Sequence, residues 1–158
     1  MSPSECIAPG PSMRLTFLMS SHPRNLPVVR AAVGQLAAMV GWSEADSRAI
    51  TLAVDEALAN VIRHAYHGSA EGTIELQCRA ADDEIEFRIR DTGDSPDVTR
   101  ICAHEIGCDK IGGLGTHIIR QVMDTVAYEV APDGNWFTAC KRLPHASGSR
   151  EKHENLSS

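Results

Sequence analysis

The strands that this sequence predicts come in adjacent pairs, and this pairing restricts the fold more than any other feature. Residues 73–79 and 84–90 have alternating character and are joined by an acidic turn at residues 82–83. Residues 125–130 and 136–142 form a second pair across a Pro-Asp-Gly turn. Strands joined by such short turns form antiparallel hairpins, whereas parallel strands need long crossover connections. The pairs therefore argue against a doubly wound parallel fold.

Three helices and one further strand complete the predicted order of elements. Residues 13–19 alternate like a strand, and residues 28–40 carry apolar residues at helical spacing. A second helix is expected from Ser43 to about Tyr66, because Ser-Glu-Ala-Asp resembles a capping box with aspartate in place of glutamate. A third helix is expected at residues 114–123. This order predicts an α+β fold, a two-layer α/β sandwich with a mixed, mostly antiparallel sheet and helices on one face.

Length, charge and cysteine content are those of an ordinary globular protein. The 158 residues predict one domain at residues 13–143, with a disordered leader at 1–12 and a disordered polar tail at 144–158. The net charge of -6 argues against general nucleic-acid binding, which needs a basic surface. No apolar stretch approaches the roughly 20 residues of a membrane span. The five cysteines are an odd number and follow no signal peptide, which indicates a cytoplasmic protein with reduced, free thiols.

The helix that begins at Ser43 carries the most informative polar residues. Opposite its core stripe, at about 100° per residue, a second face combines Glu56, Ala59, Asn60 and Arg63 with small and apolar residues. Glu56 and Asn60 are four positions apart and therefore lie one above the other. One interpretation is an exposed pair on an amphipathic helix. The other is a pocket wall, where Glu56 orients or deprotonates a nucleophile and Asn60 offers an oxygen to Mg²⁺.

The turn after the second strand of the first predicted hairpin offers a group that can recognise a nucleotide base. Asp91, Thr92 and Gly93 follow directly on residues 84–90. A carboxylate at a strand end can accept a hydrogen bond from an exocyclic amine such as that of adenine, and Gly93 lets the backbone approach the base closely. Asp-x-Gly is also a common surface turn, so this motif alone leaves both interpretations open.

Glycines at the start of the third helix offer a place for phosphate. Gly112, Gly113 and Gly115 stand where unpaired N–H groups and the positive end of a helix dipole attract anions. The segment lacks the Gly-Lys-Ser/Thr ending of a P-loop, and a flexible link is the alternative interpretation. The long connection at residues 94–111 predicts a lid over the phosphates, with Lys110 as a basic contact.

Together, these three segments resemble the Bergerat-type ATPases, the group of the gyrase, histidine-kinase and mismatch-repair ATPases. Over residues 13–143 the chain most resembles their bacterial anti-sigma factor serine/threonine-protein kinases. The resemblance rests on residues 55–66 (DEALANVIRHAY), on Asp91 with Gly93, on the glycine run at residues 112–115, and on Gly134-Asn135 followed by a strand. The second glycine that many relatives carry after Gly93 is absent.

The resemblance implies a role for each matching residue. Glu56 would be the catalytic general base, and Asn60 would bind Mg²⁺. Asp91 would read the adenine amine of ATP, with Gly93 beside it and Thr138 contributed by the last strand. A longer set would hold the phosphates through backbone amides or positive charge: Lys110, Gly112, Gly113, Leu114, Gly115 and Thr116.

The resemblance also implies a reaction and partners. The domain would transfer the γ-phosphoryl group of ATP to an anti-sigma antagonist protein, sequester a sigma factor by partner switching, and pair as a homodimer. It would use ATP and Mg²⁺ and would contact neither nucleic acid nor membrane directly. Three alternatives stay open: a non-catalytic ATP-binding regulatory module, a detached histidine-kinase ATPase domain, and a structural interaction domain.

Overall fold

The computed structural model describes residues 12–81, 83–97 and 114–143 of the chain. Within them, the helices and strands follow one another in the predicted order. They are β1 (Met13–Ser20), α1 (Leu26–Met39), α2 (Glu44–Asn60), β2 (Thr73–Ala81), β3 (Glu84–Asp91), α4 (Leu114–Val122), β4 (Thr125–Ala131) and β5 (Gly134–Arg142). A 3-10 turn, η1 (Pro23–Asn25), precedes α1, and a π-helical turn, η2 (Val61–Ala65), follows α2.

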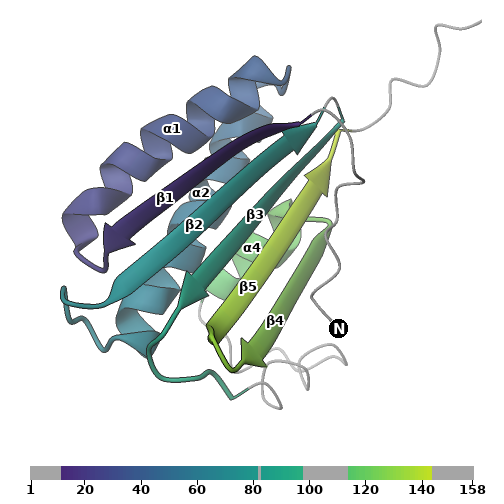
Figure 1. Ribbon diagram of the computed structural model, residues 1–158. Coiled ribbons are helices and arrows are strands. Elements are labelled where there is room, and N and C mark those ends of the chain that lie inside the picture. Colours follow the sequence, from purple (N-terminus) through teal and green to yellow (C-terminus); the bar gives the residue numbers. More distant parts are fainter. Residues whose placement is uncertain (1–11, 82, 98–113, 144–158) are drawn as a thin grey trace, which may run out of the picture.

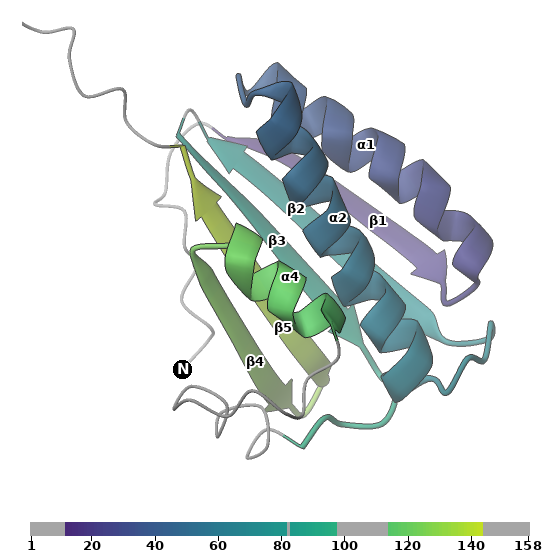
Figure 2. The same ribbon diagram turned by 180° about the vertical axis from the view of Figure 1, so that it is seen from behind.

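The five strands form one sheet in the order β1-β2-β3-β5-β4, and the helices cover one of its faces (Figure 1, Figure 2). The expected two-layer fold is therefore confirmed. All four pairings are antiparallel, so the mixed character expected for the sheet is wrong for the described strands. Both predicted hairpins, β2 with β3 and β4 with β5, are present. The pairing of β3 with β5 joins them into one sheet.

The start of α2 is fixed by the predicted serine cap. The Ser43 hydroxyl oxygen accepts a hydrogen bond from the Asp46 backbone N–H at 3.1 Å, as expected of an N-cap. The second half of the capping box differs, because the Asp46 carboxylate accepts from the Ser43 hydroxyl at 2.6 Å instead of from its backbone N–H. Aspartate is one methylene shorter than the glutamate of a capping box, so its carboxylate stays with the nearer hydroxyl.

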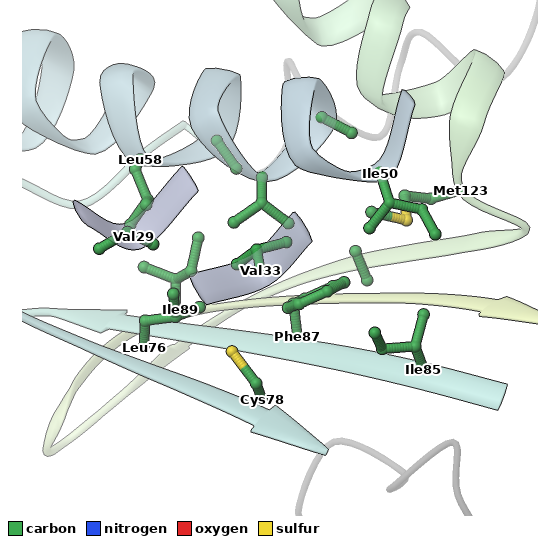
Figure 3. Close-up of a cluster of buried hydrophobic side chains, with 14 of the residues drawn as sticks. Val29, Val33, Ile50, Leu58, Leu76, Cys78, Ile85, Phe87, Ile89 and Met123 are labelled. Atoms are coloured by element: carbon green, nitrogen blue, oxygen red, sulfur yellow. The ribbon is translucent and has the colours of Figure 1, made fainter. Parts of the chain in front are cut away.

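The hydrophobic core lies between the helices and the sheet. Figure 3 shows side chains of α1 and α2 packed over those of the strands: Val29, Val33, Ile50 and Leu58 over Leu76, Cys78, Ile85, Phe87 and Ile89. In β3, the alternating residues Ile85, Phe87 and Ile89 face this core and are at most 1% exposed. Asp91 comes next in the same alternation, because successive strand side chains point to opposite faces. The strand therefore directs the Asp91 carboxylate to the helix side of the sheet.

The end of the second helix differs from the uniform α-helix expected up to Tyr66. The α-helix ends at Asn60 and continues as the π-helical turn η2, in which the Tyr66 N–H donates to the Val61 carbonyl at 3.2 Å. Gly68, at a φ of 79°, then closes the turn by donating to the Ile62 carbonyl at 2.8 Å. A π-helical turn adds a residue per turn and is often found at functional sites. Here it directly follows Asn60.

The expectations of free thiols and of no membrane span can be compared with the structure. Cys78 is a free and buried thiol, and burial raises its pKa to about 12. Cys140 is disulfide-bonded, so the expectation of free thiols fails at this position. Within the described residues, no helix is both long and apolar enough to cross a membrane. The predicted tail, most of the predicted leader and most of the predicted lid lie outside the described residues.

Candidate functional site

The helix α2 places Glu56 and Asn60 on the face that the sequence predicts. Both residues are half-buried, and the Glu56 side chain is 27% exposed. Glu56 lies one turn before Asn60, and Asn60 is the last residue of α2. This partial burial leaves the carboxylate and the amide accessible from the surface, while the buried apolar residues of α2 hold the helix in place.

Arg63 in the π-helical turn connects these two side chains. Its Nη2 donates to the Asn60 Oδ1 at 2.9 Å and lies 3.5 Å from the Glu56 Oε2. Its Nε donates to the Ala59 carbonyl at 3.3 Å. Helical spacing places Arg63 on this face, but the sequence alone gave it no role. Its position three residues after Asn60 was the available signal.

Asp91 is a buried carboxylate at the end of β3. It is 6% exposed, and its Oδ1 accepts hydrogen bonds from the Asn135 Nδ2 at 2.8 Å and from the Gly93 N–H at 3.0 Å. Burial raises the pKa of Asp91 above its ordinary value, and the two hydrogen bonds oppose that rise. Within the described residues, no group donates to the other carboxylate oxygen, Oδ2. That oxygen is therefore available to accept a hydrogen bond from a ligand.

Asn135 on β5 is a second residue to which the sequence assigned no role. It stands opposite Asp91 in the strand pairing and is 5% exposed. Besides Asp91, its Nδ2 approaches the Gly93 carbonyl at 3.1 Å. A side chain at Gly134, whose φ is 138°, would overlap with the Asp91 carbonyl oxygen. The Gly-Asn pair after the second hairpin turn was the sequence signal, since the glycine permits close approach and the amide aligns the carboxylate.

The turn after Asp91 packs directly against the end of the helix that carries Glu56 and Asn60. The Asp94 N–H donates to the Ala65 carbonyl at 2.9 Å. The Tyr66 hydroxyl accepts a hydrogen bond from the Thr92 N–H at 3.0 Å and donates one to the Thr73 carbonyl. These contacts fix the carboxylate at the strand end relative to the helix. The structure thus brings together two of the three segments that the sequence singles out.

Replacing Gly93 with alanine is expected to lower the free energy of unfolding by about 1–3 kcal/mol, the range for overpacking a filled space. A Cβ at Gly93 would overlap with the Ala65 carbonyl oxygen and lie 2.7 Å from its carbonyl carbon. Gly34→Ala is the matched control, because its Cβ would lie 3.4 Å from the Thr51 Oγ1, an ordinary contact. Urea unfolding measures both variants. Equal stability of the Gly93 and Gly34 variants would contradict the close packing described here.

The third segment is only partly described. α4 begins at Leu114 and packs against α2, and Figure 2 shows its first turn beside that helix. Thr116 is half-buried, and His117 is exposed to solvent. Lys110, Gly112 and Gly113 lie outside the described residues, so their phosphate-binding roles, like those of Leu114, Gly115 and Thr116, stay predictions.

Thr138 is placed away from Asp91. The pairing of β3 with β5 puts Thr138 opposite Arg88, while Asp91 is opposite Asn135. Because side chains alternate along a strand, Thr138 points to the sheet face that the helices do not cover. The structure therefore does not bring Thr138 to Asp91, and the expected contact of Thr138 with an adenine base is wrong.

The donor set of the site fits ATP and Mg²⁺. The Asp91 Oδ2 can accept from an exocyclic amine, and the Asn60 Oδ1 is a hard oxygen of the kind that Mg²⁺ prefers. The described residues contain no group of three or more His, Cys, Asp or Glu side chains that would hold a metal ion on their own. Mg²⁺ commonly binds through one or two protein oxygens together with substrate phosphates. A single amide oxygen at Asn60 is compatible with that arrangement.

Comparison with known proteins agrees with this geometry. The family model described as a histidine kinase-like ATPase domain matches residues 19–141. Serine-protein kinase RsbW of Listeria innocua is 31% identical over 121 residues, which cover 72% of this chain and 77% of that protein. Serine-protein kinase RsbW of Bacillus subtilis is 25% identical, over 67% of this chain and 71% of that protein.

Solved structures show the same fold. The crystal structure of the RsbU and RsbW domains of Rv1364c from Mycobacterium tuberculosis matches with a TM-score of 0.59 at 20% identity, over 86% of this chain and 33% of that chain. The histidine kinase domain of the Erythrobacter litoralis EL346 blue-light activated histidine kinase matches with a TM-score of 0.51 at 19% identity, over 77% of this chain and 60% of that chain. The chain therefore belongs to the histidine kinase-like ATPase family, in its RsbW-type, anti-sigma factor kinase branch.

Proposed function

We propose that this protein is a serine/threonine-protein kinase that binds ATP with Mg²⁺ and phosphorylates an anti-sigma antagonist protein. The observation that carries the proposal is the packing of the Asp91 turn against the helix end beyond Glu56 and Asn60. This packing holds together the Asp91 carboxylate, to which we assign base recognition, and the Glu56 carboxylate, to which we assign catalysis. The names of the RsbW relatives, which are serine-protein kinases, support the same reaction.

Recognition of the adenine base is assigned to Asp91. Its Oδ1 is occupied by Asn135 and Gly93, which leaves Oδ2 to accept a hydrogen bond from the exocyclic amine. Gly93 and Asn135 thereby act through Asp91, since they hold the carboxylate in one orientation. The phosphates are assigned to the N–H groups at the start of α4 and to Lys110.

Phosphoryl transfer is assigned to Glu56 and Asn60. Glu56 accepts the proton of the attacking hydroxyl, and Asn60 offers its Oδ1 to the metal. Bound Mg²⁺ neutralises charge on the phosphates. A positioned general base contributes about 10²- to 10⁴-fold to a rate, which corresponds to about 3–5 kcal/mol of transition-state stabilisation.

The biological role we assign is partner switching in the cytoplasm. In this scheme the protein sequesters a sigma factor, releases it, and phosphorylates the antagonist, without contacting nucleic acid or membrane. A homodimer belongs to the same proposal. Apolar side chains on β1 and α1 are available for such a contact: Leu15, Leu18 and Val28 are 40%, 72% and 66% exposed.

Incubation with γ-labelled ATP, Mg²⁺ and antagonist-type proteins encoded nearby tests the kinase directly. The expected product is an acid-stable phosphoserine or phosphothreonine on the antagonist, and Asn60→Ala is expected to prevent its formation. An acid-labile product would indicate histidine phosphorylation instead. ATP binding without transfer to any candidate would support a non-catalytic regulatory module.

A further inference from the structure

The Arg63 guanidinium occupies the oxygen that the proposed site offers to Mg²⁺. One nitrogen, Nη2, lies 2.9 Å from the Asn60 Oδ1 and 3.5 Å from the Glu56 Oε2. The Nε of the same side chain donates to the Ala59 carbonyl, which anchors the guanidinium to the backbone of α2. The positive charge therefore lies between Asn60, the proposed metal ligand, and Glu56, the proposed base for the attacking hydroxyl.

A metal ion and this guanidinium compete for the amide oxygen, because both are cations drawn to the same electron density. Mg²⁺ binds oxygen at about 2.0–2.1 Å and requires near-octahedral geometry around itself. A second cation hydrogen-bonded to the same oxygen would crowd and repel the metal ion. Arg63 in its present position therefore weakens binding of Mg²⁺ at Asn60, and its departure strengthens that binding.

We propose that Arg63 is an internal cation that closes Asn60 to free metal ions and makes metal binding depend on a bound nucleotide. The inference rests on the proposed function, because it takes Asn60 as the metal ligand. Among the residues that the structure describes, the Glu56 carboxylate and the Arg63 guanidinium form an ion pair here, and their charges balance. A triphosphate adds several negative charges, which favour the divalent ion over the guanidinium.

The geometry allows Arg63 to leave. Its side chain is 57% exposed and turns on flexible methylene groups, so it can move without disturbing the core. Its departure frees the Asn60 Oδ1 for the metal and the Glu56 Oε2 for the hydroxyl in one movement. Arg63 is thus a positioning residue: Asn60 and Glu56 become free to act only when the metal–nucleotide complex binds and the guanidinium moves away.

Titration of the nucleotide-free, full-length protein with Mn²⁺ tests this inference. The electron paramagnetic resonance signal of free Mn²⁺ reports the bound fraction. Arg63→Gln is expected to bind Mn²⁺ about tenfold more tightly than the wild type, because the competing charge-assisted hydrogen bond is removed. Adding Asn60→Ala to that variant is expected to abolish the gain.

The matched control is Arg48→Gln, which makes the same change of net charge on the helix that carries Asn60. Arg48 pairs with Glu44 at 3.5 Å, and both side chains are highly exposed. This control is expected to bind Mn²⁺ as the wild type does. Arg63→Met, which keeps much of the apolar stem, repeats the test, and thermal unfolding verifies that both Arg63 variants are folded.

Two results would overturn the inference. One is Mn²⁺ affinity in the folded Arg63 variants that equals that of the wild type. The other is an equal gain in the Arg48 control, which would show a general effect of net charge. Because this titration contains no nucleotide or protein substrate, its outcome is independent of the kinase assay. A failure of the proposed function would instead appear as absent ATP binding or absent transfer.

Discussion

Replacing Glu56 with glutamine is expected to lower the rate of phosphoryl transfer by about 10²- to 10⁴-fold, the usual contribution of a general base. Glutamine has nearly the same size, and its amide oxygen can still accept a hydrogen bond from Arg63, whose Nη2 lies 3.5 Å from the Glu56 carboxylate. It cannot accept the proton of a serine hydroxyl. ATP binding is expected to persist, because the hydrogen bonds that hold the Asp91 turn in the described part of the chain do not involve Glu56.

Single-turnover transfer from labelled ATP to the antagonist measures this effect, and calorimetric titration with ATP verifies that binding persists. Glu44→Gln is the matched control, since Glu44 lies on the same helix, is exposed and pairs with Arg48. It is expected to transfer phosphate at the wild-type rate. Transfer by the Glu56 variant within about threefold of the wild type would show that another group is the base, because a base is worth at least about 10²-fold.

Replacing Asp91 with asparagine is expected to lower the affinity for ATP by about 10- to 100-fold, the equivalent of about 1.5–3 kcal/mol for a hydrogen bond to a charged group. Asparagine has one acceptor oxygen where aspartate has two. If that oxygen stays with the Asn135 and Gly93 donors, the side-chain amide N–H groups face the adenine amine. Both groups are then donors, so no hydrogen bond forms between them. The base then loses its partner.

The same variant is expected to be at least as stable as the wild type at pH 7. Burial raises the pKa of Asp91 in the folded protein above its ordinary value, so the fold favours the protonated acid. The Asp91 carboxylate therefore destabilises the fold as pH rises through the interval between the ordinary pKa and the raised one. Below that interval the penalty is absent, and wild type and variant are expected to converge. Urea unfolding at a series of pH values measures this convergence.

A change of base preference would separate loss of recognition from general damage to the site. Inosine triphosphate carries an oxygen where ATP carries the exocyclic amine. The side-chain amide that Asp91→Asn introduces can donate to that oxygen, whereas the Asp91 carboxylate of the wild type repels it. We expect the wild type to favour ATP and Asp91→Asn to favour inosine triphosphate. An unchanged preference for ATP in the variant would contradict the role of Asp91.

Local patterns in the sequence were sufficient to predict most of the fold. Short acidic and Pro-Asp-Gly turns determine the two hairpins, and Ser43 fixes the start of α2. The pairing of β3 with β5 joins strands more than 40 residues apart, and no local pattern specifies it. Without that register, Thr138 was placed beside Asp91 although the alternation of β5 turns it to the other face. Long-range pairing is thus where the prediction failed.

The site shows the same division between local and long-range information. Glu56 and Asn60 followed from helical spacing, and Asp91 followed from its place at a strand end. Asn135 meets Asp91 only through the pairing of β3 with β5, so its role required the structure. Arg63 lies three residues after Asn60, and that spacing put it on the right face, but the sequence did not show that its guanidinium reaches both Asn60 and Glu56. The sequence thus placed residues on their faces within one segment, but it did not reveal the contact across segments that Asn135 makes.

The central claim is that ATP binds between the end of β3 and the helix that carries Glu56 and Asn60. Calorimetric titration of the full chain with ATP in the presence of Mg²⁺ tests it most directly, with Asp91→Asn measured in parallel. The expected result is saturable binding of one ATP per chain, weakened about tenfold or more in the variant. No saturable binding by the folded wild-type protein at millimolar ATP, or equal binding by the variant, would contradict the claim.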